Sequence, residues 1–218
     1  PNAYIFTGIR GVGKTTTARI VAKMLNCTIF DKNNNPDLIN CEQAKAITED
    51  RHPDVIEIDA ASNTSVENAR EIIENVKYNP VLGKYKVYIV DEVHMLSKSA
   101  FNALLKTLEE PPPHSKFIFA TTEISKVPIT ILSRCQRFDL RRVEKKTLSD
   151  FLKSIAKKED ITISNEALNL IVKASDGSVR DSLSILDQAN VFKSQKEIQV
   201  EEIVNMLGFA RQGDLYEL

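Results

Sequence analysis

The sequence has no tryptophan, only 7 glycines and 3 cysteines among 218 residues, and no excess of either charge. Its 29 basic and 30 acidic residues give a net charge of −1, which argues against a nucleic-acid-binding protein that relies on a strongly basic surface. Three scattered cysteines cannot form a disulfide scaffold and are typical of a reducing, cytoplasmic compartment. The sequence contains neither an apolar run of about 18 residues nor a signal peptide, so no membrane span and no export are expected.

The composition that is present is that of a folded protein. Hydrophobic residues make up 42% of the chain and charged residues 27%, a balance that argues against intrinsic disorder. At roughly 150 residues per domain, the length predicts one domain and a smaller second one. The sequence starts at Pro1 directly before an apolar run, without an initiator methionine, and we expect parts of the protein to be missing at both ends.

Short apolar runs alternate with longer amphipathic segments over the first part of the sequence. The run at residues 87–90 is apolar throughout, as in a central strand that is buried on both faces of a sheet. Alternating strands and helices predict an α/β fold, in which a parallel sheet is covered by helices on both faces. The expected strands are residues 4–6, 55–58, 87–90, 117–120 and 137–140, and the expected helices are residues 14–25, 66–76, 98–108 and 128–133.

Helical periodicity replaces this alternation after residue 140. Four apolar side chains with i, i+3, i+4, i+7 spacing predict one buried helix face. These side chains are Leu148, Phe151, Leu152 and Ile155. The expected helices are residues 147–158, 165–174, 179–192 and 200–207.

The change of pattern predicts the domain organisation. We expect an α/β domain at residues 1–142, truncated at its N-terminus, and a small all-helical domain at residues 143–210. Residues 211–218 would begin a further domain.

Basic residues are concentrated where the helical part begins. Residues 141–158 contain seven Lys or Arg and two acidic residues. One interpretation is a solvated helix face, and the other is a surface that lies near an acidic partner or a nucleic acid. The sequence leaves both interpretations open.

The segment from Gly8 to Thr15 fits the pattern G-x-x-x-x-G-K-[ST] at every fixed position, between an expected strand and an expected helix. Its glycines let successive backbone N–H groups face a phosphate, and the helix N-terminus adds positive potential. Lys14 would contact the β- and γ-phosphates of ATP, and the Thr15 hydroxyl would bind Mg²⁺. The alternative is a glycine-rich turn without a ligand. The predicted nucleotide-binding residues are Gly8, Arg10, Gly11, Val12, Gly13, Lys14, Thr15, Thr16 and Asp91.

Two adjacent carboxylates follow the apolar run at residues 87–90. A buried parallel strand would deliver Asp91 to the sheet edge at which the phosphate loop lies, where it would hold Mg²⁺ together with Thr15. Glu92 would polarise the attacking water, which favours hydrolysis over nucleotide binding alone. The alternative, an acidic turn, is weakened by the phosphate loop.

Three further polar positions are candidates for catalysis. Thr121 and Thr122 end an expected strand, where a hydroxyl would reach the γ-phosphate or the water, although threonine is also common in strands. Arg134 would act as an arginine finger on a phosphate in a neighbouring subunit, or else form a surface salt bridge. Arg180 opens an expected helix and would reach the γ-phosphate, or else be an ordinary helix arginine.

With these residues in place, the chain resembles the AAA+ family of ATPases and, within it, the bacterial clamp loader. The resemblance implies that Lys14 and Thr15 are Walker A residues and that Asp91 and Glu92 are Walker B residues. It also implies that Thr122, beside Thr121, is sensor 1, that Arg134 is the trans-acting finger, and that Arg180 is sensor 2. The resemblance rests on residues 8–15, 56–62, 91–96, 101–112 and 130–135.

The resemblance implies a function as well as a fold. The protein would be an ATP hydrolase in a hetero-pentameric ring of clamp-loader subunits, within the bacterial replicative DNA polymerase holoenzyme. With ATP and Mg²⁺, it would open the sliding clamp and place it on primed DNA, which it would hold by backbone contacts. The protein would be cytoplasmic and associated with the nucleoid. Residues 211–218 would begin a collar domain, and regions beyond this sequence would carry contacts with polymerase and helicase.

The cysteines depart from the family pattern. The family usually has a four-cysteine zinc site here, but only Cys27 and Cys41 match its outer ends and residues 28–40 contain no cysteine. Two thiolates do not complete a tetrahedral site, so we predict two free thiols and no zinc. Asp31, Asp37 or His52 as substitute ligands lack a recognisable spacing.

Two other functions fit part of the sequence. A DExH-like helicase motor would need a second motor domain, which the helical part does not provide. A non-catalytic scaffold subunit of a AAA+ ring would not need Lys14, Thr15 and Glu92.

Overall fold

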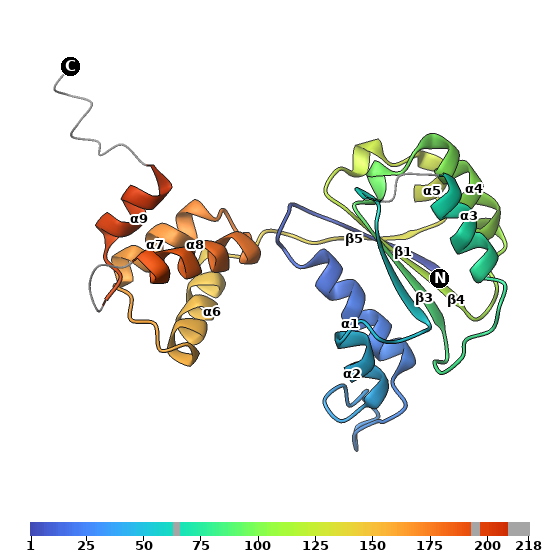
Figure 1. Ribbon diagram of the computed structural model, residues 1–218, viewed down its shortest axis with the longest axis horizontal. Coiled ribbons are helices and arrows are strands. Elements are labelled where there is room, and N and C mark those ends of the chain that lie inside the picture. Colours follow the sequence, from blue (N-terminus) through green and yellow to red (C-terminus); the bar gives the residue numbers. More distant parts are fainter. Residues whose placement is uncertain (63–65, 193–196, 209–218) are drawn as a thin grey trace. The chain divides into compact units, whose positions relative to one another are not determined.

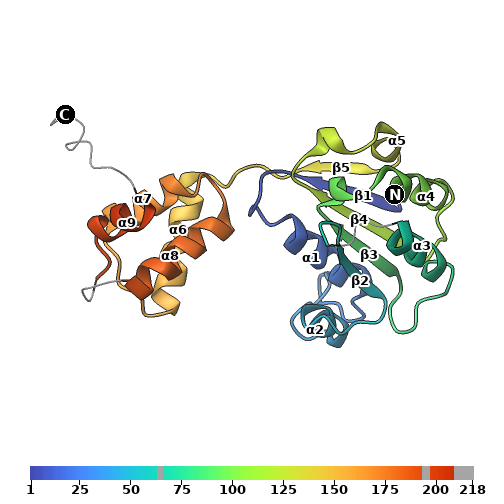
Figure 2. The ribbon, with the colours of Figure 1, turned by 45° about the horizontal axis from the view of Figure 1, so that its top comes forward.

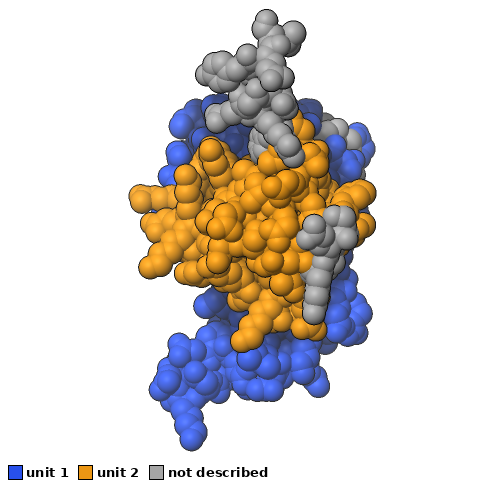
Figure 3. All heavy atoms as spheres, turned by 90° about the vertical axis from the view of Figure 1, so that its left-hand side faces the viewer, with its two compact units in different colours: residues 1–8, 14–140 blue, residues 9–13, 141–218 orange. Residues whose placement is uncertain are grey.

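A computed structural model describes residues 1–62, 66–192 and 197–208. The chain divides into two compact units, which are coloured separately in Figure 3. The first unit contains Pro1–Gly8 and Lys14–Leu140, and the second contains Ile9–Gly13 and Arg141–Leu218. The predicted collar segment at residues 211–218 lies outside the described residues.

The first unit is built on a sheet of five parallel strands, as predicted (Figure 1). The strand order is β2-β3-β4-β1-β5, so β1 lies between β4 and the edge strand β5. Every residue of β3 except the last is buried, which explains the unbroken apolar run that predicted it. The strands are β1 (Ala3–Thr7), β2 (Val55–Asp59), β3 (Lys86–Asp91), β4 (Ser115–Thr121) and β5 (Gln136–Asp139).

Helices cover both faces of this sheet, as the alternation predicted (Figure 2). Side chains alternate along β3, so Val87 and Ile89 pack with α1 while Tyr88 and Val90 face α3 and α4. The buried core on the α3 and α4 face is the larger of the two. The helices of this unit are α1 (Lys14–Asn26), α2 (Glu42–Thr48), α3 (Val66–Asn75), α4 (Lys98–Glu109) and α5 (Ile129–Leu132).

Some short elements differ from the prediction. Helix α2 was not predicted, because it has only 7 residues and buries only Ala44 and Ile47, too few for a visible period. The predicted helix at residues 128–133 is a single turn, α5. Short 3₁₀ helices, η1 (Val93–Met95) and η2 (Ile124–Lys126), follow β3 and β4.

A buried carboxylate holds the loop that leads into β3. Asp54 is fully buried, and its two oxygens accept hydrogen bonds from the backbone N–H groups of Val81, Leu82 and Gly83, each at 2.7 Å. Burial alone would raise the pKa of Asp54, but these three N–H donors and His52 outweigh it and hold the pKa below its ordinary value.

The second unit is helical, as predicted. In the part of this unit that the structure describes, the core consists of apolar side chains from all four helices and from the segment before the last of them. Phe151 is an exception to the predicted helix face, because it is 37% exposed while Leu148 and Leu152 are buried. Among the described residues, no helix is long and apolar enough to cross a membrane. The helices are α6 (Lys145–Lys158), α7 (Asn165–Ala174), α8 (Val179–Phe192) and α9 (Val200–Leu207).

Candidate functional site

The candidate site of the first unit lies at the carboxyl ends of three neighbouring parallel strands. Gly8 follows β1, Asp91 ends β3 and Thr121 ends β4. Thr7 and Thr121 are register partners, so the ends of β1 and β4 meet at one edge of the sheet. In open α/β sheets this edge is where ligands bind.

Lys14 lies at this edge as the first residue of α1. Its ammonium nitrogen donates a hydrogen bond to the Gly8 carbonyl at 3.1 Å, and the residue is only 6% exposed. Burial lowers the pKa of Lys14, while Glu92 and Asp91 oppose that shift. The ammonium group of Lys14 is therefore held at the Gly8 carbonyl, with carboxylates nearby that favour its charged form.

Thr15 and Asp91 are in direct contact. The Thr15 hydroxyl donates to Asp91 Oδ2 at 2.6 Å, and Asp91 Oδ1 accepts the backbone N–H of Glu92 at 2.9 Å. A hydroxyl beside a carboxylate is a donor set suited to Mg²⁺, which prefers oxygen ligands. The residues present therefore fit the metal that the family resemblance implies.

Glu92 is turned toward the end of β4. Its backbone is left-handed (φ 45°, ψ 46°), which is unusual for a residue other than glycine. One carboxylate oxygen, Oε2, accepts both the hydroxyl of Thr122 at 2.9 Å and the backbone N–H of Thr122 at 3.1 Å. The predicted base and the predicted sensor 1 residue are thus hydrogen-bonded to each other, whereas Thr121 contacts His94 instead.

Arg134 lies on the surface of the first unit. Its Nη1 donates to the Thr130 carbonyl at 2.6 Å, and its Nη2 is paired with Glu109 of α4. These contacts within one subunit hold the guanidinium at the surface. The predicted role in a neighbouring subunit remains a prediction.

Gly11 and Arg180 belong to the second unit. The Gly11 carbonyl accepts the backbone N–H groups of Val179 at 3.0 Å and Arg180 at 3.3 Å. Gly11 has φ +77°, and a Cβ there would lie 2.1 Å from the Ser178 hydroxyl oxygen, so only glycine fits. The Arg180 side chain is exposed, and its predicted contact with a γ-phosphate remains a prediction.

Cys27 and Cys41 form a buried pair between α1 and α2. Burial would raise the pKa of Cys41, but hydrogen bonds from backbone N–H groups and from the Cys27 thiol lower it to about 7. The carboxylates of Asp31 and Asp37 accept N–H groups of the loop between the cysteines. In the described part of the chain, no three His, Cys, Asp or Glu side chains gather as metal ligands, and two thiols do not fit a closed zinc site.

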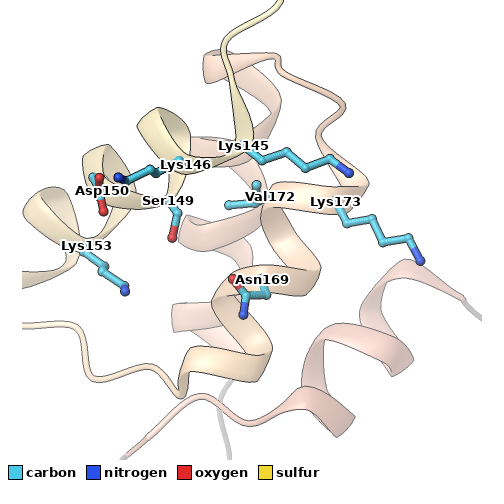
Figure 4. A pocket seen from close by; sticks show the side chains of 8 residues that line it. All are labelled: Lys145, Lys146, Ser149, Asp150, Lys153, Asn169, Val172 and Lys173. Atoms are coloured by element: carbon cyan, nitrogen blue, oxygen red, sulfur yellow. The ribbon is translucent and has the colours of Figure 1, made fainter.

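A basic groove lies on the second unit, between α6 and α7 (Figure 4). It encloses about 500 Å³, and lysines dominate its lining. The predicted basic segment contributes the α6 side of the groove, but the lysine and asparagine from α7 could be found only from the structure. The lining residues are Lys145, Lys146, Ser149, Asp150, Lys153, Asn169, Val172 and Lys173.

Two family models match most of this chain. Residues 1–144 match the family model described as DNA polymerase III, delta subunit. Residues 147–194 match the model of the DNA polymerase III clamp loader subunit, ATPase lid domain. The chain belongs to the clamp-loader subunits of DNA polymerase III.

Relatives of this clamp-loader chain are bacterial replication proteins. It is 49% identical over 207 residues to DNA polymerase III subunit tau/gamma of Haemophilus influenzae, which covers 95% of this chain and 30% of the relative. It is 48% identical over 213 residues to subunit tau of Bacillus subtilis, covering 97% of this chain and 37% of the relative. The chain therefore spans about a third of the length of these relatives.

The fold of the clamp-loader chain is that of AAA+ P-loop ATPases. The Thermotoga maritima RuvB Holliday junction branch migration motor superposes with a TM-score of 0.65 at 18% sequence identity. The match covers 95% of this chain and 61% of RuvB. At this identity the likeness concerns the fold alone, and it confirms the predicted fold class.

Proposed function

We propose that the chain is the ATPase motor of a clamp-loader subunit, which uses ATP to place a sliding clamp on primed DNA. The contact between Thr15 and Asp91 carries this proposal, because it joins the phosphate loop to a carboxylate at the end of β3. A folded phosphate loop without that carboxylate would support nucleotide binding only.

The residues at the sheet edge have separate roles in this proposal. Lys14 neutralises charge on the β- and γ-phosphates, and the backbone N–H groups of the loop hold their oxygens. Thr15 and Asp91 would hold Mg²⁺, which supplies charge neutralisation between the phosphates when it is bound. Glu92 orients the attacking water and accepts its proton.

Thr122 connects the γ-phosphate position with the base. Its hydroxyl donates to Glu92 in this structure and lies at the end of the strand next to β1. A hydroxyl that exchanges one carboxylate oxygen for a phosphate oxygen would release Glu92 toward the water only when nucleotide is bound. Thr122 is therefore proposed as sensor 1.

Further subunits complete the site in the proposed ring. Arg134 would leave Glu109 and stabilise the transition state in the neighbouring subunit, as an arginine finger does. Arg180 would report the γ-phosphate to the helical unit. The clamp, primed DNA and the other subunits are the proposed partners, and the site of action is the bacterial cytoplasm.

Turnover of the assembled complex tests this proposal. We expect the ATPase rate of the full-length protein with its partner subunits to rise when clamp and primed DNA are added together. Lys14→Ala should abolish that turnover while the complex still assembles. An ATPase rate that does not change when clamp and primed DNA are added would indicate a P-loop ATPase with another function. Strand unwinding by the protein alone would favour the helicase alternative.

A further inference from the structure

His94 is a buried histidine that lies between the two strand ends of the candidate site. It follows Glu92 in η1, and its side chain is only 6% exposed. Its Nδ1 lies 2.9 Å from the hydroxyl oxygen of Thr121 and 3.3 Å from Glu92 Oε2. Its Nε2 lies 3.4 Å from Glu123 Oε1, so one ring faces three side chains near the ends of β3 and β4.

The hydrogen bonds around Thr121 indicate which nitrogen of the His94 ring carries the proton. Thr121 Oγ1 accepts the backbone N–H of Glu123 at 3.0 Å, so its own proton is available for His94 Nδ1. The Nε2 proton then points toward Glu123. Through these contacts the imidazole joins the turn after β3 to the end of β4.

The backbone conformation of Glu92 explains why a contact between the turn after β3 and the end of β4 is needed. A left-handed conformation is unfavourable for a residue with a Cβ, so surrounding contacts must hold it. Thr122 holds the Glu92 carboxylate, and His94 holds Thr121, the neighbour of Thr122. A change at His94 would therefore move the Glu92 carboxylate relative to the end of β4.

We infer that His94 is a positioning residue for hydrolysis, which fixes the Glu92 carboxylate against the end of β4 through its Nδ1 contact with Thr121. The inference rests on the proposed function, because Glu92 is the base only if the site hydrolyses ATP. His94 does not reach the nucleotide in this proposal. It sets the place of the base, and a base displaced by about 1 Å can lose about 100-fold in rate.

Three substitutions separate this role from that of a histidine that only supports the core. An asparagine amide lies near the place of Nδ1, whereas a glutamine amide lies near the place of Nε2. We expect His94→Ala and His94→Gln to lower kcat about 10- to 100-fold, with little change in the KM for ATP. His94→Asn should recover most of the rate. The measurements use the full-length protein assembled with its partner subunits, clamp and primed DNA.

One control and one variant of the partner residue accompany these substitutions. His114, which lies before β4 begins, donates its Nε2–H to the Val76 carbonyl at 3.0 Å, and His114→Ala should leave kcat unchanged. Thr121→Val removes the partner of Nδ1 while keeping the branched shape. It should lower kcat as His94→Ala does, and the double variant should lose no more than either single variant.

Each outcome decides a separate question. A wild-type kcat for His94→Ala, or equal losses in all three variants that follow their melting temperatures, would overturn the positioning role. If His94→Ala fails to fold, a wild-type kcat for Thr121→Val would overturn it in the same way. Lys14→Ala, measured in parallel, tests the proposed function itself: if its turnover is normal, the failure lies there and not at His94.

Discussion

The hydroxyl of Thr15 donates to Asp91 Oδ2 at 2.6 Å, across 76 positions of sequence. This hydrogen bond holds together the two oxygens that would bind Mg²⁺. The two protein ligands of the metal would therefore already be adjacent, and metal binding would replace the hydrogen bond between Thr15 and Asp91. In the proposed function, the hydroxyl of Thr15, rather than its methyl group, would be the part of the side chain that acts.

Thr15→Val tests that interpretation, because valine keeps the shape and loses the oxygen. We expect Mg²⁺-dependent ATP hydrolysis to fall about 100-fold, and Thr15→Ser to recover most of it. The measurement is the ATPase rate as a function of Mg²⁺ concentration. Thr48→Val is the matched control, since the Thr48 hydroxyl donates only to the Ala44 carbonyl of its own helix. An unchanged rate in Thr15→Val would remove Thr15 from the metal site.

Much of this edge of the sheet could be predicted from the sequence. The apolar run of β3 identified a buried strand, and parallel strands necessarily bring their carboxyl ends to one edge. That rule places Asp91 beside the phosphate loop without any knowledge of side-chain contacts. The same reasoning located the strand that ends at Thr121.

Other parts of the site depend on geometry that no sequence pattern reveals. The left-handed turn at Glu92 directs its carboxylate to Thr122, and it also brings His94 to Thr121. The alternation of a strand predicts neither contact. Lys173 similarly reaches the basic groove only because α6 and α7 pack together.

Arg134→Ala tests the trans-acting role. In the assembled complex we expect turnover to fall about 10³-fold or more, since an arginine finger contributes that much. The nucleotide affinity of the isolated chain should stay the same, because Arg134 is paired with Glu109 on its own subunit. Arg137→Ala is the control, as Arg137 also forms a surface ion pair, with Asp139 at 2.7 Å. Full turnover of the Arg134 variant would contradict the prediction.

The basic groove between α6 and α7 predicts a contact with DNA phosphates. Lysines act as point charges without base-specific geometry, which suits sequence-independent backbone contacts. Binding of primed duplex DNA, followed by fluorescence polarisation at several salt concentrations, measures how many charges take part. Each lysine that contacts a phosphate contributes about 0.9 to the slope of log K against log salt. Replacing the four lysines that line the groove by glutamine should therefore reduce this slope by up to about 3.6. The four are Lys145, Lys146, Lys153 and Lys173.

A set of four exposed lysines of the first unit serves as the control for charge alone. Their replacement by glutamine removes the same charge elsewhere and should change the slope much less. Equal changes in both sets would mean diffuse attraction and would assign no role to the groove. The control lysines are Lys32, Lys45, Lys77 and Lys84.

The cysteine pair predicts a fold that does not depend on zinc. Structural zinc typically contributes about 10 kcal/mol or more to folding, so its removal is easily seen. We expect a strong chelator to leave the melting temperature unchanged, and the purified protein to contain far less than one zinc per chain by mass spectrometry. Stoichiometric zinc that is lost together with stability would show that Cys27 and Cys41 have further ligands.

From the buried Asp54 carboxylate we predict that part of the free energy of unfolding depends on pH. Its pKa in the folded protein is held below its ordinary value, since the N–H groups of Val81, Leu82 and Gly83 and the nearby His52 outweigh the effect of burial. The folded state therefore binds the proton more weakly than the unfolded state does. The contribution is complete above the ordinary carboxyl pKa, and it is lost as the pH falls through the lower folded value.

Asp54→Asn removes this contribution at every pH. Near neutral pH we expect its free energy of unfolding to be lower than that of the wild type by about 1–3 kcal/mol, the cost of breaking buried hydrogen bonds to a charged group. Urea unfolding measures the free energy of unfolding of the wild type and the variant between pH 7 and pH 3. The difference between the two should stay constant as the pH is lowered from 7 and should shrink once the pH falls below about 4. Asp187→Asn, at an exposed position of α8, should show no such difference. A gap that stays constant down to pH 3 would mean that the loop is held by shape and not by the charge of Asp54.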